Sequence, residues 1–200
     1  RDYSTYFSIL QLIASGYTRQ GEIDGIIGKN SGPYLNNLSE GYSLIQRRLP
    51  LLSKPGTRNL RWYIADNFLN FWFRFIYPHQ SAIELEKYAE LNTYIKSHYV
   101  QYSGGMLEKY FRDRVAETTN VTLVGNYWDS KGENEIDLIA LNDFEKKGLV
   151  AEVKRNPDKI NYTLLAQKMA NLPKEFSKYS LIQKGLSLDD METVSYTHLT

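Results

Sequence analysis

Two carboxylates and one lysine in the second half of the chain have the residue types of a metal-dependent hydrolytic site. Asp137 lies in the apolar run Glu135–Leu141, and Glu152 and Lys154 lie in a second apolar run, Gly148–Lys154. Both runs have the length and aliphatic content of buried strands. Like charges opposed on a strand pair are unfavourable, and a hard cation with oxygen ligands would compensate them. The pattern therefore predicts a site for a hard cation if the strands pair in register.

The register follows if the two runs form a hairpin through the polar loop 142–147, with Leu141 facing Gly148. Counting back from that pair places Asp137 opposite Glu152, and directly opposed residues share a face. Lys154, two residues beyond Glu152, points the same way. A register shift by two would keep all three side chains on one face, whereas a shift by one would not.

The same residues also have a structural interpretation. Glu152 and Lys154 would then form a surface ion pair on an edge strand. A second Glu-x-Lys sequence, Glu145–Lys147, is expected to be a solvated hairpin loop. The metal-site interpretation depends on the order of elements, in which a helix carrying Glu108 precedes the strands and another helix follows them.

In that order, Asp137 followed by Glu152-x-Lys154 resembles the active-site motif of the PD-(D/E)xK nuclease superfamily. The resemblance implies that Asp137 and Glu152 bind Mg²⁺ (or Mn²⁺) and that Lys154 positions or activates the attacking water. The family often adds a glutamate from the preceding helix, for which Glu108 is the candidate. It also often adds a polar residue from the following helix, for which Gln167 is the candidate.

The second half of the chain is predicted to be a mixed α/β domain of restriction-endonuclease-like type, so the fold class is α/β (α+β overall). Its expected elements are a helix over 106–115, strands over 121–128, 135–141 and 148–154, a helix over 162–172 and a strand over 179–183. Gly104-Gly105 predicts a break before the first of these helices. The polar tail from Ser187 is expected to fray.

The first half is predicted to be a winged-helix domain, in which three helices precede a β-hairpin. The expected helices cover 7–13 (ending at Gly16), 22–27 and about 32–46, and the hairpin strands cover 49–52 and 60–64. Ser31 is expected to cap the third helix. An aromatic helix over 68–77, capped by Asp66, must be buried on several sides. The domains are then 1–77, a helical connector 78–103, and 104–200.

Five basic residues surround the predicted hairpin with no acidic residue between them: Arg47, Arg48, Lys54, Arg58 and Arg61. A basic stretch of this kind contacts nucleic-acid phosphates, although a solvated surface is the alternative. The third helix has no Arg or Lys before Arg47, which disfavours base readout in the major groove. Non-specific DNA contact is therefore the expectation.

Composition limits the remaining site classes. The chain has no cysteine, which excludes disulfides and thiolate zinc sites. Its three histidines are scattered, without the close pairing that most zinc sites need, and its net charge is +1. No signal peptide or bilayer-spanning run is recognisable, so a cytoplasmic protein without a membrane partner is expected. A start at Arg1 rather than Met suggests a fragment. Gly25–Asn30 superficially resembles a phosphate-binding loop, but its spacing is too short for one.

Nearly the whole chain, about Ser4 to Leu188, is similar to the C-terminal region of archaeal-type AAA+/STAND-like ATPases. The resemblance is carried by the aromatic helix in Leu60–Phe75, by Gly105–Phe111, and by the acidic strand pair that follows. It implies an upstream P-loop ATPase domain of the same polypeptide as a partner, with ATP bound only there. DNA is the other expected partner, and the sequence is compatible with an oligomer.

Three hypotheses follow from these patterns. The first is a metal-dependent DNA endonuclease module with a DNA-associated winged helix. The second is a catalytically inactive regulatory or partner-binding module that couples the ATPase to DNA or protein. The third is structural, with the winged helix acting as a lid on the nucleotide domain.

Overall fold

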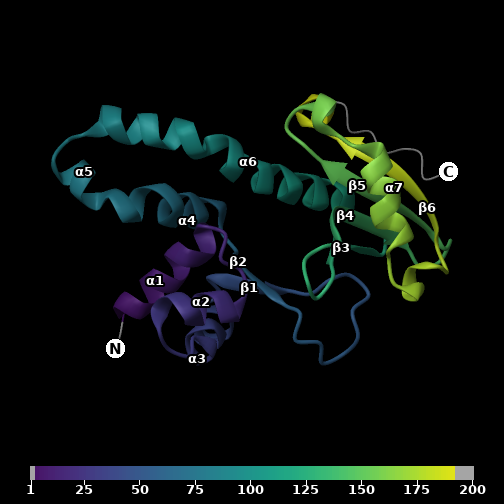
Figure 1. Ribbon diagram of the computed structural model, residues 1–200, viewed down its shortest axis with the longest axis horizontal. Coiled ribbons are helices and arrows are strands. Elements are labelled where there is room, and N and C mark those ends of the chain that lie inside the picture. The colour runs from purple at the N-terminus through teal and green to yellow at the C-terminus, as the bar shows by residue number, and fades with distance from the viewer. Residues whose placement is uncertain (1–2, 192–200) are drawn as a thin grey trace. The chain divides into compact units, whose positions relative to one another are not determined.

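The computed structural model describes residues 3–191 and divides into two compact units (Figure 1). Unit 1 comprises the described residues up to Leu49 together with Leu60–Ser97. Unit 2 comprises Pro50–Asn59 and the described residues from His98 onward. Each unit is therefore built from two separate stretches of the chain.

Unit 1 begins with three helices followed by a two-stranded antiparallel hairpin. Its elements are α1 (Tyr3–Ala14), α2 (Gln20–Ile27), α3 (Gly32–Asn36) with a π-helical turn (Asn37–Gly41), β1 (Ile45–Arg48) and β2 (Arg61–Ile64). Gly28 ends α2 in the left-handed conformation, with φ of +70°, and its N–H donates to the carbonyl of Asp24. The positions of the first two helices confirm the prediction.

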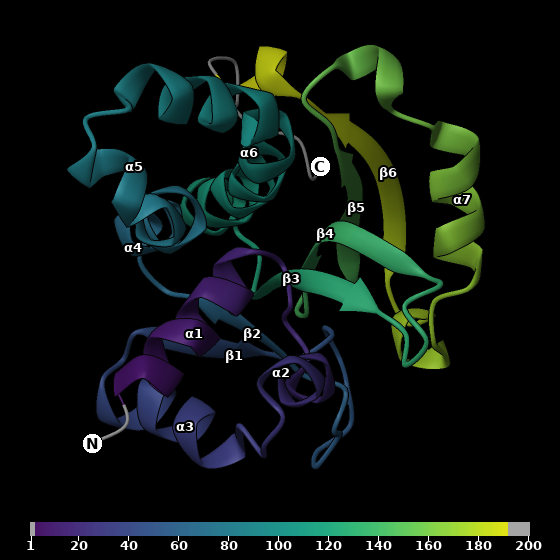
Figure 2. The ribbon, with the colours of Figure 1, turned by 60° about the vertical axis from the view of Figure 1, so that its left-hand side comes forward.

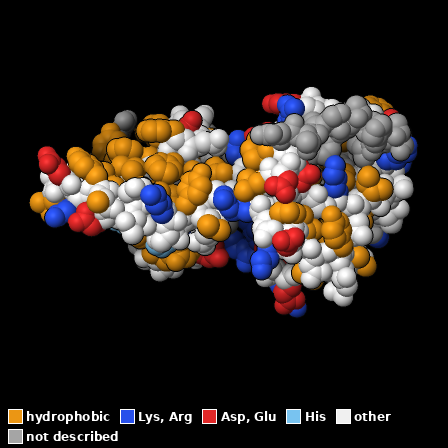
Figure 3. Space-filling view, turned by 90° about the horizontal axis from the view of Figure 1, so that it is seen from above, with side chains coloured by type: hydrophobic (Ala, Val, Ile, Leu, Met, Phe, Trp, Pro, Cys, Tyr) orange, Lys and Arg blue, Asp and Glu red, His pale blue; other side chains and the backbone are white. Residues whose placement is uncertain are grey.

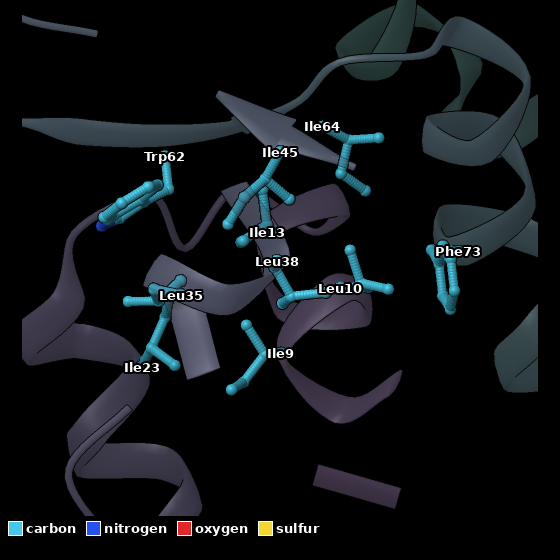
Figure 4. Close-up of a cluster of buried hydrophobic side chains, with 10 residues drawn as sticks. All are labelled: Ile9, Leu10, Ile13, Ile23, Leu35, Leu38, Ile45, Trp62, Ile64 and Phe73. Atoms are coloured by element: carbon cyan, nitrogen blue, oxygen red, sulfur yellow. The ribbon is translucent and has the colours of Figure 1, made fainter. Parts of the chain in front are cut away.

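The core of unit 1 draws one to three side chains from each of these elements, and Figure 4 shows them converging. Its buried members are Ile9, Leu10, Ile13, Ile23, Leu35, Leu38, Ile45, Trp62, Ile64 and Phe73. Because they come from three helices, both strands and the aromatic segment, these elements are stabilised together rather than singly.

The third helix begins at Gly32 as predicted but ends earlier than expected, and the prediction of the first hairpin strand was wrong. The helix ends at Gly41, Ser43 adopts a φ of +55°, and Ile45–Arg48 pairs with Arg61–Ile64 as a strand. The cause is burial, because Ile45 lies opposite Ile64 and both enter the core. Ser31 precedes α3 but does not cap it, since its hydroxyl and its N–H both donate to the Asp24 carboxylate.

The aromatic segment is divided into short helical pieces: α4 (Asn67–Phe71), a π-helical turn (Trp72–Ile76), a 3₁₀ turn (Tyr77–His79) and α5 (Gln80–Glu84). Asp66 caps it as predicted, accepting from the N–H of Leu69 at 2.8 Å. Phe73 and Phe75 are buried, but Phe68 is 67% exposed within the described chain. The expectation of burial on several sides therefore holds for only part of the segment.

The long helix α6 (Tyr88–Thr118) runs without interruption through Gly104 and Gly105, where a break was predicted. Downstream of these glycines, Leu107, Phe111 and Val115 are buried against the sheet of unit 2. This packing offsets the helix penalty of about 1 kcal/mol for each glycine.

Unit 2 contains a four-stranded mixed sheet in the order β3-β4-β5-β6. Its elements are β3 (Leu123–Trp128), β4 (Glu135–Asn142), β5 (Lys147–Val153), α7 (Tyr162–Ala170) and β6 (Ser180–Leu186), with 3₁₀ turns at Pro157–Lys159, Lys174–Phe176 and Leu188–Asp190. The β3–β4 and β4–β5 pairs are antiparallel and the β5–β6 pair is parallel. The mixed α/β class expected for this half is observed.

Helices cover both faces of this sheet, with the later part of α6 on one side and α7 on the other (Figure 2). The α6 side buries Leu107, Phe111, Val115, Leu138, Ala140, Leu149, Ala151, Val153 and Leu186. The α7 side buries Ile136, Ile139, Leu141, Val150, Leu165, Phe176 and Tyr179. Burial on both faces explains why the strands have continuous apolar runs.

The stretch Pro50–Asn59, which contains most of the predicted first hairpin strand (49–52) and the turn after it, belongs to unit 2. The N–H of Leu51 donates to the carbonyl of Asn126 on strand β3. The amide of Asn59 forms two hydrogen bonds with Trp128, accepting from the indole N–H at 3.0 Å and donating to the backbone carbonyl. Leu51 packs directly over Gly125, where a β-carbon would lie 3.3 Å from its side chain.

The predicted fraying from Ser187 is wrong for the first residues of the tail. Ser187 is buried, accepts from the N–H of Asp189 and donates to Asp190 at the start of a 3₁₀ turn. The last strand also extends to Leu186, beyond the predicted end at Gln183, because it pairs with β5 along its whole length. The rest of the expected tail, residues 192–200, lies outside the described residues.

Hydrophobic side chains gather on the surface of unit 1 over α5 and the first part of α6 (Figure 3). Leu85, directly after α5, and Tyr88, at the start of α6, are among the exposed hydrophobic residues of this region. Among residues 3–191, no helix combines the length and apolar character needed to cross a lipid bilayer.

Two glycine substitutions are expected to have opposite effects on stability. In Gly148→Ala the new methyl group would lie 2.6 Å from Leu141 and 2.8 Å from Leu181, so the free energy of unfolding should fall by about 1–3 kcal/mol. In Gly105→Ala the new methyl group meets nothing within 4 Å, so stability should rise by up to about 1 kcal/mol. Urea denaturation of the two variants measures both effects, and a stabilised Gly148→Ala would contradict the packing of this hairpin.

Candidate active site

The strand pair that carries the acidic residues has the predicted register. Leu141 pairs with Gly148, and the pairing continues without a shift to Leu138 opposite Ala151. Asp137 and Glu152 come next on their strands. The Asn142 side chain stabilises the connecting loop, because its oxygen accepts from the N–H groups of Phe144 and Glu145.

Lys154 brings the two carboxylates together at the end of the strands. Its Nζ lies 3.4 Å from Oδ2 of Asp137 and 3.1 Å from Oε1 of Glu152. The Lys154 backbone N–H donates to the carbonyl of Leu186 on β6, which fixes where the side chain begins. The predicted convergence of two carboxylates and an ammonium group is therefore observed.

Glu152 is the most buried of the three, with 5% of its surface exposed. Its second oxygen, Oε2, accepts from the N–H of Asn161 at 3.1 Å, directly before α7. Strand β5 lies between β4 and β6, so the alternative of a surface pair on an edge strand is wrong. A carboxylate at an interior position requires partners of this kind, because desolvation without compensation is costly.

Asp137 lies at an irregularity of strand β4. Gly125 pairs with Ile139 and Tyr127 with Ile136, so β4 contains one residue more than β3 between these pairs. Oδ2 of Asp137 accepts from the backbone N–H of Val153 at 2.9 Å, in addition to its contact with Lys154. Among the described residues, Oδ1 has no hydrogen-bond partner, which leaves one hard oxygen for a further ligand.

Glu108, on α6, is electrostatically coupled to this group. Burial, followed by the nearby charge of Asp137, raises the pKa of Glu108 to about 7, while Arg112 and Lys154 act in the opposite direction. For Lys154, burial lowers the pKa, but Asp137 and Glu152 outweigh it, so its pKa lies above the ordinary value. Lys154 is therefore an ammonium ion at neutral pH, whereas Glu108 can gain or lose a proton there.

The donor set fits a small divalent cation that keeps part of its water shell. Within the described part of the chain, no three acidic or histidine side chains gather closely enough to enclose a metal ion. Mg²⁺, however, is commonly held by one or two carboxylates together with waters and substrate phosphate oxygens. Asp137 and Glu152 offer such a pair, with Lys154 as the third charged group.

Gln167, the predicted polar residue of the following helix, is exposed on α7. The contact from this region to Glu152 comes from the backbone of Asn161, whose side chain also caps α7 by accepting from Leu164. The sequence contained a usable signal for the start of α7, because an asparagine directly before an apolar helical run is a typical N-cap, but it contained none for the backbone contact to Glu152.

The five predicted nucleic-acid-binding residues are divided between the units. Arg47 and Arg48 lie on β1 and Arg61 on β2, whereas Lys54 and Arg58 belong to the stretch Pro50–Asn59 of unit 2. Arg48 pairs with Arg61 across the hairpin and stacks over the ring of Tyr63, 4.4 Å from its centroid. The hairpin itself therefore presents two opposed arginines.

Comparison with known proteins gives a family match for the central part of the chain. Residues 72–170 match the family model DUF234, described as archaea bacterial proteins of unknown function. The matched region begins in the aromatic segment and ends with α7, so it contains all the acidic residues and the lysine of the candidate site.

The Uncharacterized protein MJECL04 of Methanocaldococcus jannaschii is 41% identical to the chain over 161 residues. The alignment covers 76% of the present chain and 36% of the relative, so the chain spans about a third of that relative's length. No solved structure gives a significant match.

The raised pKa of Glu108 predicts a pH-dependent contribution to stability. Its carboxyl has a pKa near 4.5 when unfolded and about 7 when folded, so the folded state binds the proton more tightly. The stabilisation is complete below pH 4.5 and is lost as the pH rises through 7. Glu108→Gln should therefore be more stable than the parent at pH 8, by about 1–3 kcal/mol, and similar to it at pH 4.5.

Urea denaturation at both pH values, in EDTA, measures this difference. Glu117→Gln, at an exposed position near the end of the same helix, provides the control. Equal stability of Glu108→Gln and the parent at pH 8 would contradict the coupling of Glu108 to the site.

Proposed function

We propose that unit 2 is a metal-dependent nuclease-like module that hydrolyses phosphodiester bonds in DNA. The observation that carries the proposal is the position of the Lys154 ammonium group, 3.4 Å from Asp137 and 3.1 Å from Glu152 at the end of two adjacent strands. Two carboxylates and a cation in this arrangement suit a negatively charged phosphate ester and a hard metal ion.

Asp137 and Glu152 would hold the metal, Mg²⁺ or Mn²⁺. Oδ1 of Asp137 has no hydrogen bond among the described residues, and Oε1 of Glu152 is bonded only through Lys154. When bound, a divalent cation supplies charge stabilisation for the phosphate and lowers the pKa of water.

Lys154 would orient the attacking water and neutralise charge on the phosphate, rather than accept a proton. Its pKa lies above the ordinary lysine value because two carboxylates face it, so it remains a hydrogen-bond donor at neutral pH. Glu108, with a pKa of about 7, is the group better suited to exchange a proton during the reaction.

Unit 1 is proposed to be a winged-helix domain that contacts DNA without base specificity. Three helices followed by an antiparallel hairpin support this assignment. The whole polypeptide is further proposed to carry an upstream P-loop ATPase domain and to act in the cytoplasm. The matched relative, of which the chain spans 36%, is long enough for such a domain.

A second candidate function is an inactive regulatory or partner-binding module of the same fold. The ion pairs favour it, because Lys154 by itself partly compensates both carboxylates in the absence of a metal. In that case Asp137, Glu152 and Lys154 would only stabilise the fold of unit 2, and the carboxylates would bind no metal.

Calorimetric titration with Mn²⁺ separates the two candidates. The intact chain should bind the ion, and Asp137→Asn should weaken binding at least about tenfold because a charged ligand is lost. The asparagine oxygen still accepts from the N–H of Val153, so this variant should remain folded. Asp137→Asn should also lose Mg²⁺-dependent cleavage of linear and branched DNA.

The matched control is Asp143→Asn, at the opposite end of strand β4. Asp143 is ion-paired with Lys146 at 2.7 Å, far along the strand from the candidate site. This control should bind Mn²⁺ like the parent. If the parent binds no Mn²⁺ at millimolar concentration, the nuclease proposal fails and the regulatory module is favoured.

A further inference from the structure

Arg155 directly follows the site lysine and is held by two residues of α6. Its Nη1 donates to the hydroxyl of Ser103, which is 8% exposed. Its guanidinium carbon lies 5.9 Å from the centre of the Tyr99 ring. These contacts fix the direction of a side chain that is otherwise costly to order.

No carboxylate among the described residues lies within ion-pair distance of Arg155. The Ser103 hydroxyl accepts from one of the five N–H donors of Arg155, and it donates its own hydrogen bond to the carbonyl of Tyr99. The neighbouring Lys154, in contrast, contacts two carboxylates. A partly exposed guanidinium group with spare donors, on the residue that follows Lys154, is therefore available for an anion.

Tyr99 adds an aromatic surface to this cation. Tyr99 is 46% exposed, although the guanidinium group lies over its ring. The ring of Tyr102 is its neighbour one turn further along α6, with centroids 6.2 Å apart. Cations alternating with accessible aromatic rings are typical of surfaces that bind single-stranded nucleic acids, because phosphates and unstacked bases alternate along the strand.

We propose that Arg155 and Tyr99 form a binding subsite for an unpaired nucleotide next to the cleavage position. Arg155 binds the phosphate, and the exposed ring of Tyr99 stacks on the base. The proposal rests on the proposed function, because it takes the Asp137–Glu152–Lys154 group as the place of cleavage. It identifies the substrate class as DNA with a single-stranded segment at the cut.

The test measures binding without chemistry, in EDTA, by fluorescence anisotropy of a labelled 12-nucleotide oligo(dT) and of a duplex of the same length. Arg155→Gln retains a donor for Ser103 but removes the charge, so its affinity for oligo(dT) should fall about tenfold. The slope of log affinity against log salt should also become shallower by about 0.7, the value for one phosphate contact on a single strand.

Tyr99→Leu should weaken oligo(dT) binding by about fivefold or more and leave duplex binding nearly unchanged, because only an unpaired base can stack on the ring. The matched charge control is Lys178→Ala. Lys178 lies 3.7 Å from Asp143, next to the hairpin loop at the opposite end of β5, and its loss should leave oligo(dT) binding at the parental level.

Thermal denaturation of the same variants shows whether they fold, and Mn²⁺ calorimetry shows whether the metal site is intact. Variants that melt like the parent but bind oligo(dT) with parental affinity and salt slope would overturn the subsite. Equal losses of oligo(dT) and duplex binding in Tyr99→Leu would overturn the stacking role. Mn²⁺ binding should be unchanged in Arg155→Gln, so loss of the subsite and loss of the metal site give different results.

Discussion

The structure of unit 2 depends on placing one negative charge inside a sheet. Glu152 lies on an interior strand that is covered by a helix on each face, and only 5% of its surface is exposed. Such a position is tolerable only when the carboxylate is paired and hydrogen-bonded. Lys154 and the N–H of Asn161 meet this requirement, and each is fixed in turn, by the carbonyl of Leu186 and by the start of α7. The parallel strand and the helix after β5 are therefore part of the same electrostatic arrangement.

Much of this arrangement was predictable because it follows from strand periodicity. The two apolar runs and the short polar loop between them predicted the β4–β5 register, and the period of two along each strand predicted the approach of Asp137 to Glu152. The irregularity beside Asp137 was not predictable, since a bulge leaves no periodic signal. The Asn161 contact was missed for a related reason: it comes from a loop backbone, whose course depends on tertiary packing rather than on side-chain type.

Elsewhere, local signals competed with burial and were overridden. The run that follows Pro33 has helical spacing, but Ile45 is buried opposite Ile64 and therefore belongs to a strand. Gly104 and Gly105 are poor helix formers, yet the packing of the residues after them keeps α6 continuous. In both cases the missing information was which distant segment would cover the residue, and that information is absent from a window of neighbouring residues.

The assignment of Pro50–Asn59 to unit 2 has a consequence for how the chain folds during synthesis. The Leu51 and Asn59 contacts to Asn126 and Trp128 cannot form until strand β3 has left the ribosome, about seventy residues later. Unit 1 can form its own core earlier, but the segment Pro50–Asn59 between β1 and β2 remains an open loop until β3 is available. An early segment therefore joins a later one only after β3 has been synthesised, and premature termination before β3 would leave that loop without its partner surface.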